Sequence, residues 1–420
     1  MKHSSKSEAS APESSRAGKN WMIDDPSEHY ISIRQVFFLA IACCLLIANM
    51  YGVQPIISDI ASNLAIPIKS SGIILTLAQI GYGVGVLFIV PLGDSFENKR
   101  LILLLLCCLA IALFMVHLAA GMLVFYAAIF CVGLCSSVVQ LIIPFSIGLI
   151  RPSQRGRLSS IIVAGAALGM VLGRPIFSFL TGLTGWRGVY LMAAGSVCAI
   201  IILFYYSIPA KACFAKKLSY PGIFVSMGKL FVTMPKVRSQ VFMLLCNFTG
   251  FTLFWASFPI MLASELQFTH NDIAMLSLAS LAAPLGVVVA GSMADKGWRL
   301  AIIGFGAFLC LLAFLITPLL GLATATMLLA IIFMDSGLNI SNVFIQQAVL
   351  LENANARSRL NALIISVAFA GGALGSYWGP YIYTNFGWTP TALTGSTLSL
   401  ISLGAYLHMR SVYKNEKSSI

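Results

Sequence analysis

Runs of about twenty apolar residues recur along the whole chain and constrain its fold more than any other feature. Each run is long enough to cross the apolar part of a bilayer, about 30 Å, as an α-helix. A membrane β-barrel would instead need segments of about ten residues with alternating polarity. We therefore predict an all-α membrane protein with twelve transmembrane helices, at residues 36–56, 71–92, 101–119, 122–148, 158–182, 188–208, 241–263, 272–293, 300–318, 323–350, 360–383 and 388–409.

The composition excludes several other classes. Hydrophobic residues make up 59% of the chain and charged residues 10%, against about half and about a quarter in soluble domains. Nine of the ten cysteines fall within predicted spans, where free cysteine behaves as a small apolar residue. No histidine near Cys131 and Cys135 completes a zinc site, and no phosphate-binding loop is present. We expect no metal and no cofactor.

Lysine and arginine are distributed very unequally between the two sets of loops. With a cytoplasmic N-terminus, 23 of the 26 basic residues lie on the cytoplasmic side, as the positive-inside rule requires. Only Lys69 and Arg187 fall in outer loops, and Arg174 falls within a span. We predict cytoplasmic N- and C-termini. The net charge of +12 is then explained by loop charge and anionic lipid headgroups, without nucleic acid.

An internal repeat divides the chain. "RGRL" at 155–158 returns as "RSRL" at 357–360, and Gly185-Trp186 returns as Gly387-Trp388 at the same offset. Six spans separate the copies, so both halves enter the membrane in the same orientation, as in parallel-repeat transporters. The predicted domains are a tail at 1–34, a six-helix half at 35–208, a cytoplasmic linker at 209–240, a second six-helix half at 241–410 and a tail at 411–420.

Three loop motifs carry a resemblance to a known family: "PLGDSFENKR" (91–100), "QRGRLSS" (154–160) and "ARSRLN" (356–361). With the repeat, they resemble the major facilitator superfamily, in particular its bacterial arabinose-efflux-permease-like and drug/proton antiporter branch. The resemblance implies a monomeric multi-pass protein of the bacterial inner membrane that exchanges a small organic molecule for protons.

The same resemblance implies a cytoplasmic gate. In the family, an Asp and basic residues between spans two and three help to hold the halves together when the cytoplasmic side is closed. Exposed ion pairs suit a gate because each contributes only about 0–1 kcal/mol. The matching positions in this sequence are Asp94, Lys99, Arg100, Arg155, Arg157, Asp295, Arg299, Arg357 and Arg359. The alternative for the basic residues is that they only set topology.

Two charged residues lie clearly within predicted spans: Arg174 in the fifth and Asp335 in the tenth. Charge at this depth costs at least about 2.5–3.5 kcal/mol, so such residues face the protein interior or water. Asp335 also begins a stripe of polar residues at spacings of four, three and four, which places them on one helix face. The stripe predicts a wet cavity, with hydrogen bonding between helices as the alternative. Its other members are Asn339, Asn342 and Gln346.

Spans one, four, seven and ten surround the central cavity in the family. The polar residues of the first, fourth and seventh spans then become candidate cavity residues. Aromatic residues of the seventh span, such as Phe251 and Trp255, could serve a substrate, but packing is the commoner role of such residues, and we rank Asn247 above them. The candidates are Asn49, Gln54, Gln140 and Asn247.

The sequence therefore favours a secondary transporter that works by alternating access, most simply in proton-coupled efflux. Arg174 remains protonated, whereas a carboxylate can gain or lose a proton with its surroundings. We predict that Arg174 keeps Asp335 ionised in one state and that their separation allows protonation in another. Alternatively, Arg174 snorkels or binds an anionic substrate while Asp335 makes a structural hydrogen bond. Uptake by symport and a non-transporting sensor or scaffold also stay open, whereas no arrangement of catalytic residues indicates an enzyme.

Overall fold

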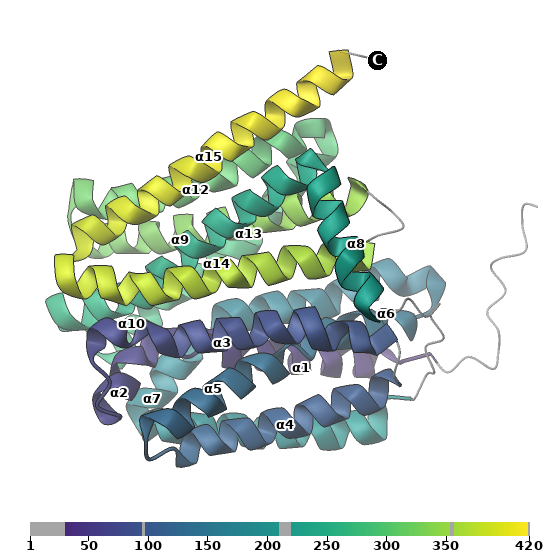
Figure 1. The fold of residues 1–420 in the computed structure, drawn as a ribbon. Helices are drawn as coiled ribbons and strands as arrows, with labels where there is room; N and C mark the ends of the chain where they lie inside the picture. The colour runs from purple at the N-terminus through teal and green to yellow at the C-terminus, as the bar shows by residue number, and fades with distance from the viewer. Residues whose placement is uncertain (1–29, 95–96, 210–219, 353–356, 419–420) are drawn as a thin grey trace, which may run out of the picture.

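The computed structural model describes residues 30–94, 97–209, 220–352 and 357–418, and no strand occurs in these ranges. Long helices lie side by side and form two layers that follow the order of the chain (Figure 1). The prediction of an all-α membrane protein is confirmed.

The first layer contains the elements before residue 208. The first predicted span is α1 continued by α2, the second is α3 continued by short π and 3-10 stretches, and the fourth is α5 continued by α6. The helices of this layer are α1 (Ile33–Tyr51), α2 (Ile57–Asn63), α3 (Gly72–Val84), α4 (Asn98–Leu118), α5 (Met122–Ser136), α6 (Val139–Gly148) and α7 (Arg155–Ser207).

The second layer repeats this arrangement after a connecting helix, α8 (Tyr220–Thr233). Its eighth predicted span consists of two helices joined by the 3-10 turn η6 (Leu278–Leu281). The helices of this layer are α9 (Pro235–Glu265), α10 (His270–Ser277), α11 (Ala282–Met293), α12 (Arg299–Leu320), α13 (Thr324–Glu352), α14 (Arg357–Phe386) and α15 (Trp388–Ser418).

Ten helical segments of the described ranges are long and apolar enough to cross a membrane. One of them, residues 152–207, supplies two passes because α7 turns at Gly185, where φ is +70°. A left-handed φ of this kind is cheap only for glycine. With α15, which is helical but richer in polar residues, the twelve predicted spans are present.

The repeat read from the sequence has a structural counterpart at the helix turns. Gly387, the second copy of Gly185, has a φ of +82°. The tryptophan after each glycine, Trp186 or Trp388, is 5% or 6% exposed. Both copies therefore use a left-handed glycine to reverse the chain and a buried tryptophan to hold the turn.

Glycines of the repeat also set the closest helix contacts. A methyl group on Gly169 would collide with the backbone of Cys44 on α1, and one on Gly371 would collide with the backbone of Leu245 on α9. Small residues of this kind allow membrane helices to pack through their backbones. The pairs α1–α7 and α9–α14 are thus equivalent.

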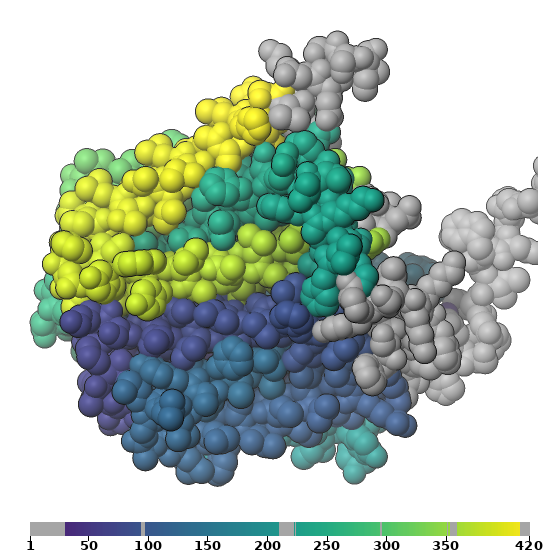
Figure 2. Space-filling view, viewed as in Figure 1, coloured from purple at the N-terminus to yellow at the C-terminus, as the bar shows by residue number. Residues whose placement is uncertain are grey.

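The bundle has two ends. At one end, which we call the α2 end, lie α2 and α10; at the other, the α8 end, α8 runs over the second layer and reaches the edge of the first (Figure 1). The turn at Gly185 also lies at the α2 end, since Arg187 donates to Asn63 of α2. Met227 of α8 packs against Leu87 from the first layer and Leu363 from the second. Along the bundle, the layers meet where α3 lies against α14 (Figure 2).

Candidate functional site

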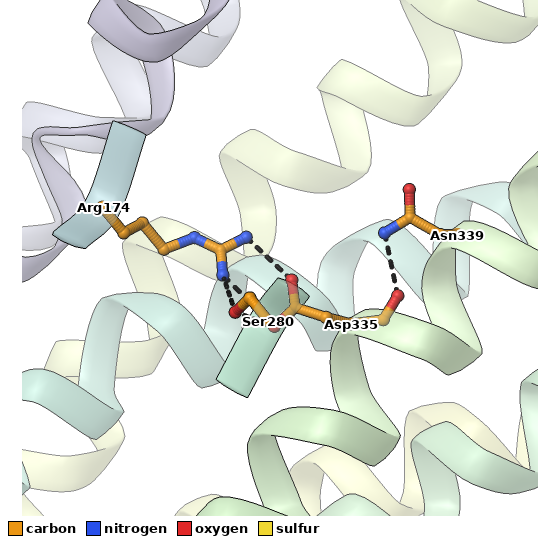
Figure 3. A network of polar contacts seen from close by, with 4 residues as sticks. All are labelled: Arg174, Ser280, Asp335 and Asn339. Atoms are coloured by element: carbon orange, nitrogen blue, oxygen red, sulfur yellow. Dashed lines mark hydrogen bonds and ion pairs between the residues drawn. The ribbon is translucent and has the colours of Figure 1, made fainter. Parts of the chain in front are cut away.

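Arg174 of α7 and Asp335 of α13 form an ion pair across the two layers (Figure 3). The guanidinium donates from Nη2 to Oδ1 of Asp335 at 2.8 Å and from Nη1 to Oδ2 at 3.2 Å. Both side chains are completely buried. They lie about three helical turns from the α2 end, so neither charge reaches the end of the bundle.

Ser280 is the third member of this cluster. Its hydroxyl accepts from Nη1 of Arg174 at 2.9 Å and donates to Oδ2 of Asp335 at 3.0 Å. Ser280 lies on η6, the 3-10 turn between α10 and α11, and mid-helix 3-10 stretches often mark functional positions. Three elements thus contribute to one closed set of hydrogen bonds.

Aromatic rings of α9 cover the guanidinium. Its central carbon lies 3.8 Å from the ring centroid of Trp255 and 5.4 Å from that of Phe251. A cation over a desolvated tryptophan face gains about 2 kcal/mol or more. Trp255 therefore stabilises the charge that Asp335 balances.

The sequence around Arg174 explains its position. Gly173 lies against Ala48 of α1, where a Cβ would crowd the backbone, so α7 approaches α1 closely at this level. Pro175 follows within the helix and removes one backbone hydrogen bond. α7 is thus fixed against α1 on one side. The side chain of Arg174 points the other way, across to the second layer.

The polar stripe of α13 is not uniform. Asp335 is fully buried, whereas Asn339, Asn342 and Gln346 are half-buried. Asn339 donates to the backbone oxygen of Asp335 at 2.8 Å (Figure 3), and Gln346 donates to Asn361 of α14 at 2.7 Å. The stripe therefore becomes more accessible from Asp335 towards the α8 end.

The remaining cavity candidates differ in whether their side chains have hydrogen-bond partners. Gln140 donates to the hydroxyl of Tyr82 at 3.0 Å, within the first layer. Asn49, Gln54 and Asn247 are nearly fully buried. Each has a side-chain polar atom without a hydrogen-bond partner among the described residues.

Polar contacts also join the layers at the α2 end. Nε2 of His270 lies 3.2 Å from Oδ1 of Asp59, and Ser178 donates to the backbone oxygen of His270 at 2.9 Å. Nearby, Thr76 of α3 donates to the backbone oxygen of Ala373 of α14 at 3.1 Å. The layers are therefore connected at this end.

The gate candidates lie towards the α8 end. Lys99 donates to the carbonyl oxygens of Tyr205 and Ile208 at 2.9 and 2.6 Å, which satisfies carbonyls left free at the end of α7. Arg100 of α4 pairs with Glu97, the residue directly before that helix. Both contacts lie within the first layer.

The other gate candidates make varied contacts. Arg155 and Arg157 are exposed, Arg299 is half-buried, and Arg359 donates to Ser226 of α8. The side chains of Asp94, Asp295 and Arg357 lie outside the described residues, although their backbones are helical.

Ser280, Asp59 and His270, which join the layers, were not singled out from the sequence. Trp255 was named with the aromatic residues of the seventh span but ranked below Asn247, and it covers Arg174. The spacing of Phe251 and Trp255, four residues on one face of that span, explains why both rings contact the same guanidinium.

Residues 39–350 match the sequence profile described as the Major Facilitator Superfamily. The chain belongs to this superfamily. It is therefore a multi-pass membrane transporter, and the resemblance seen in the loop motifs is confirmed.

Individual relatives agree with this assignment. The chain is 30% identical over 380 residues to the uncharacterized transporter YgaY of Escherichia coli O157:H7, covering 89% of this chain and 95% of the relative. It is 24% identical over 185 residues to a chloramphenicol efflux pump of Mycobacterium tuberculosis, covering 43% and 45%. A crystal structure of the nucleoside transporter NupG has the same fold, with a TM-score of 0.74, 13% identity and coverage of 90% and 100%.

Proposed function

We propose that this transporter moves a small organic solute by alternating access, that the movement is coupled to protons, and that Arg174 and Asp335 are the coupling pair. One observation carries the proposal: the two charges in the middle of the bundle are completely buried, come from different layers and are paired with each other at 2.8 Å. A rocking movement between the layers has to act on this contact.

Separation of Arg174 from Asp335 raises the free energy of each buried charge. A buried ion that loses its partner is destabilised by about 3–5 kcal/mol. Arginine keeps its proton, so the carboxylate is the group that becomes neutral by taking up a proton. Opening of the site would then be accompanied by protonation of Asp335, and closing around the pair by release of the proton.

The distribution of basic loops supports an orientation with the α8 end in the cytoplasm. Both termini are then cytoplasmic, and the protein resides in the bacterial inner membrane. The contacts of Asp59, Ser178 and Thr76 close the α2 end, whereas the polar stripe is more accessible towards the α8 end. We infer a conformation that is closed to the outside.

The similar efflux pump supports export as the direction. The protein would act as a monomer, with two transport domains at 35–208 and 241–410. Its cytoplasmic gate would consist of Asp94 and Asp295 with the neighbouring basic residues. These gate contacts would form between the halves when the α8 end closes.

Transport and coupling are tested together in proteoliposomes that contain the purified protein and a pH-sensitive dye. A compound panel first identifies a solute whose addition moves protons in the wild-type protein. Arg174→Gln should abolish this movement, and Asn385→Gln, on the exposed surface of α14, should leave it intact. Solute movement without proton movement in the wild-type protein would contradict the proposal.

A further inference from the structure

One face of α9 combines aromatic and amide side chains next to the buried pair. Asn247, Phe251 and Trp255 follow one another at intervals of four residues, so they lie along one side of the helix. Phe251 and Trp255 both contact the guanidinium of Arg174. Asn247 therefore lies one turn further towards the α8 end, beside the central cluster.

Asn247 is buried but unpaired. Its side chain is 3% exposed, and neither its amide oxygen nor its amide nitrogen has a hydrogen-bond partner among the described residues. A buried amide without partners loses the hydrogen bonds that water would give it, which is unfavourable. A ligand with both a donor and an acceptor would satisfy both atoms.

Other buried polar atoms of the two layers are also unpaired. Nδ2 of Asn49, Oε1 of Gln54 and Nε1 of Trp255 have no hydrogen-bond partner within the described ranges, and all three side chains are at least nine-tenths buried. α9 packs against the short helix that begins at Gln54. Neutral donors and acceptors thus come from both layers.

The charges of the site are already balanced. Arg174 is paired with Asp335 through two hydrogen bonds, and its face is covered by Trp255. A charged ligand would have to displace one of these contacts, whereas an uncharged ligand can use the amides and leave the pair in place.

Aromatic rings from both layers add flat surfaces. Tyr51 meets Phe251 edge-on at 6.4 Å between ring centroids, and Tyr82 stacks on Phe369 at 4.1 Å. Phe369 in turn lies 5.6 Å from Phe248 of α9. Such surfaces favour a planar ring, because aromatic rings attract one another in stacked and edge-to-face arrangements beyond the area they bury.

We propose that the substrate is an uncharged, planar heterocycle with an amide-like edge, such as a nucleobase or its nucleoside, and that Asn247 binds this edge. An asparagine amide can form two parallel hydrogen bonds with such an edge, as it does with adenine in DNA. This inference rests on the proposed transport function and specifies its substrate class.

Binding is the direct test. The full-length protein in lipid nanodiscs is titrated with radiolabelled hypoxanthine and uridine, and with tetraphenylphosphonium and benzoate as charged planar probes. Saturable binding of at least one heterocycle is expected. Asn247→Leu should weaken it at least about tenfold, since the hydrogen bonds to the amide are lost and the ligand's polar edge is left unpaired in a buried site.

Two matched variants give the test its specificity. Asn247→Gln keeps both amide atoms and should retain part of the affinity. Asn385→Leu replaces an exposed asparagine that bonds its own helix and should change nothing. Equal affinity in wild type and Asn247→Leu, or saturable binding of the charged probes alone, would overturn the inference.

The binding test of the substrate class and the test of proton-coupled transport can fail independently of each other. If proteoliposomes exchange protons for an organic cation and neither heterocycle binds, the substrate class is wrong and proton-coupled transport stands. If hypoxanthine or uridine binds through Asn247 but is not moved across the membrane, the ligand class stands and the proposed transport is wrong.

Discussion

Among the residues that the structure describes, the Arg174–Asp335 ion pair and the contact between Asp59 and His270 both connect the layers of this transporter, and they differ mainly in their access to water. Arg174 and Asp335 lie in the middle of the bundle with side chains that are 0% exposed. Asp59 and His270 lie at the α2 end with side chains that are 33% and 32% exposed. The N–O distances of the two contacts, 2.8 and 3.2 Å, are similar. The exposure of their side chains to water is what differs.

Exposure to water determines how much free energy is needed to break each contact. An exposed pair contributes about 0–1 kcal/mol and breaks readily, which would suit a contact that opens during the proposed transport cycle. A buried pair cannot lose one partner without a cost of about 3–5 kcal/mol. The central pair therefore needs a compensating event, and protonation of the carboxylate is the simplest one.

The largest expected effect comes from removing the central cation. Arg174→Gln leaves the Asp335 carboxylate buried beside Ser280 without its counter-charge. We expect a loss of about 3–5 kcal/mol of stability at neutral pH, seen as a markedly lower melting temperature in detergent.

A double variant separates lost charge balance from lost packing. Arg174→Gln combined with Asp335→Asn removes both charges and should recover most of the melting temperature. A double variant as unstable as Arg174→Gln would mean that the arginine acts through its packing on Trp255 rather than through its charge.

An intermediate effect is expected at Ser280. Ser280→Ala removes the hydroxyl that bonds both members of the pair but leaves their direct contact. Hydrogen bonds to charged groups contribute about 1.5–3 kcal/mol, so a moderate decrease in melting temperature is expected. Ser399→Ala is the control, since Ser399 is equally buried and bonds only its own helix; equal effects of both variants would remove Ser280 from the cluster.

A smaller effect is expected at the α2 end. Asp59→Asn should change the free energy of unfolding by at most about 1 kcal/mol, seen as a small change in melting temperature, but shift the layers towards an outward-open arrangement. Spin labels on α2 and α10 would measure this shift as longer distances. An effect as large as that of Arg174→Gln would contradict the distinction between the two pairs.

The smallest effect is expected for Glu97, whose partner Arg100 lies three residues further along the chain and is largely exposed. Glu97→Gln should leave both the melting temperature and the spin-label distances unchanged, because local surface pairs contribute a few tenths of a kcal/mol. A measurable shift in the distances would indicate that this pair also takes part in gating.

The sequence predicted the membrane fold well because its signals are local. Length and polarity identify a span, and Gly185-Trp186 with Gly387-Trp388 identifies the repeat because both turns need the same left-handed glycine. Arg174 and Asp335 were recognised for a similar reason: a charge within an apolar run is conspicuous without knowledge of its neighbours.

The partners were harder to predict because they depend on how helices are rotated against one another. Ser280 is an ordinary residue for a membrane helix, and only the 3-10 turn brings its hydroxyl between two charges. Asp59 and His270 lie near helix ends, where polar residues are common. Asn339 had the correct spacing for the stripe, but its amide nitrogen bonds the backbone of its own helix.

The most direct test of the central claim is proton movement in proteoliposomes that contain Asp335→Asn. The variant has a side chain of nearly the same shape that cannot carry the coupling proton. If Asp335 is the coupling group, solute exchange at equal concentrations should persist while solute-driven proton movement is lost. Proton movement that matches the wild-type protein in Asp335→Asn would contradict the account.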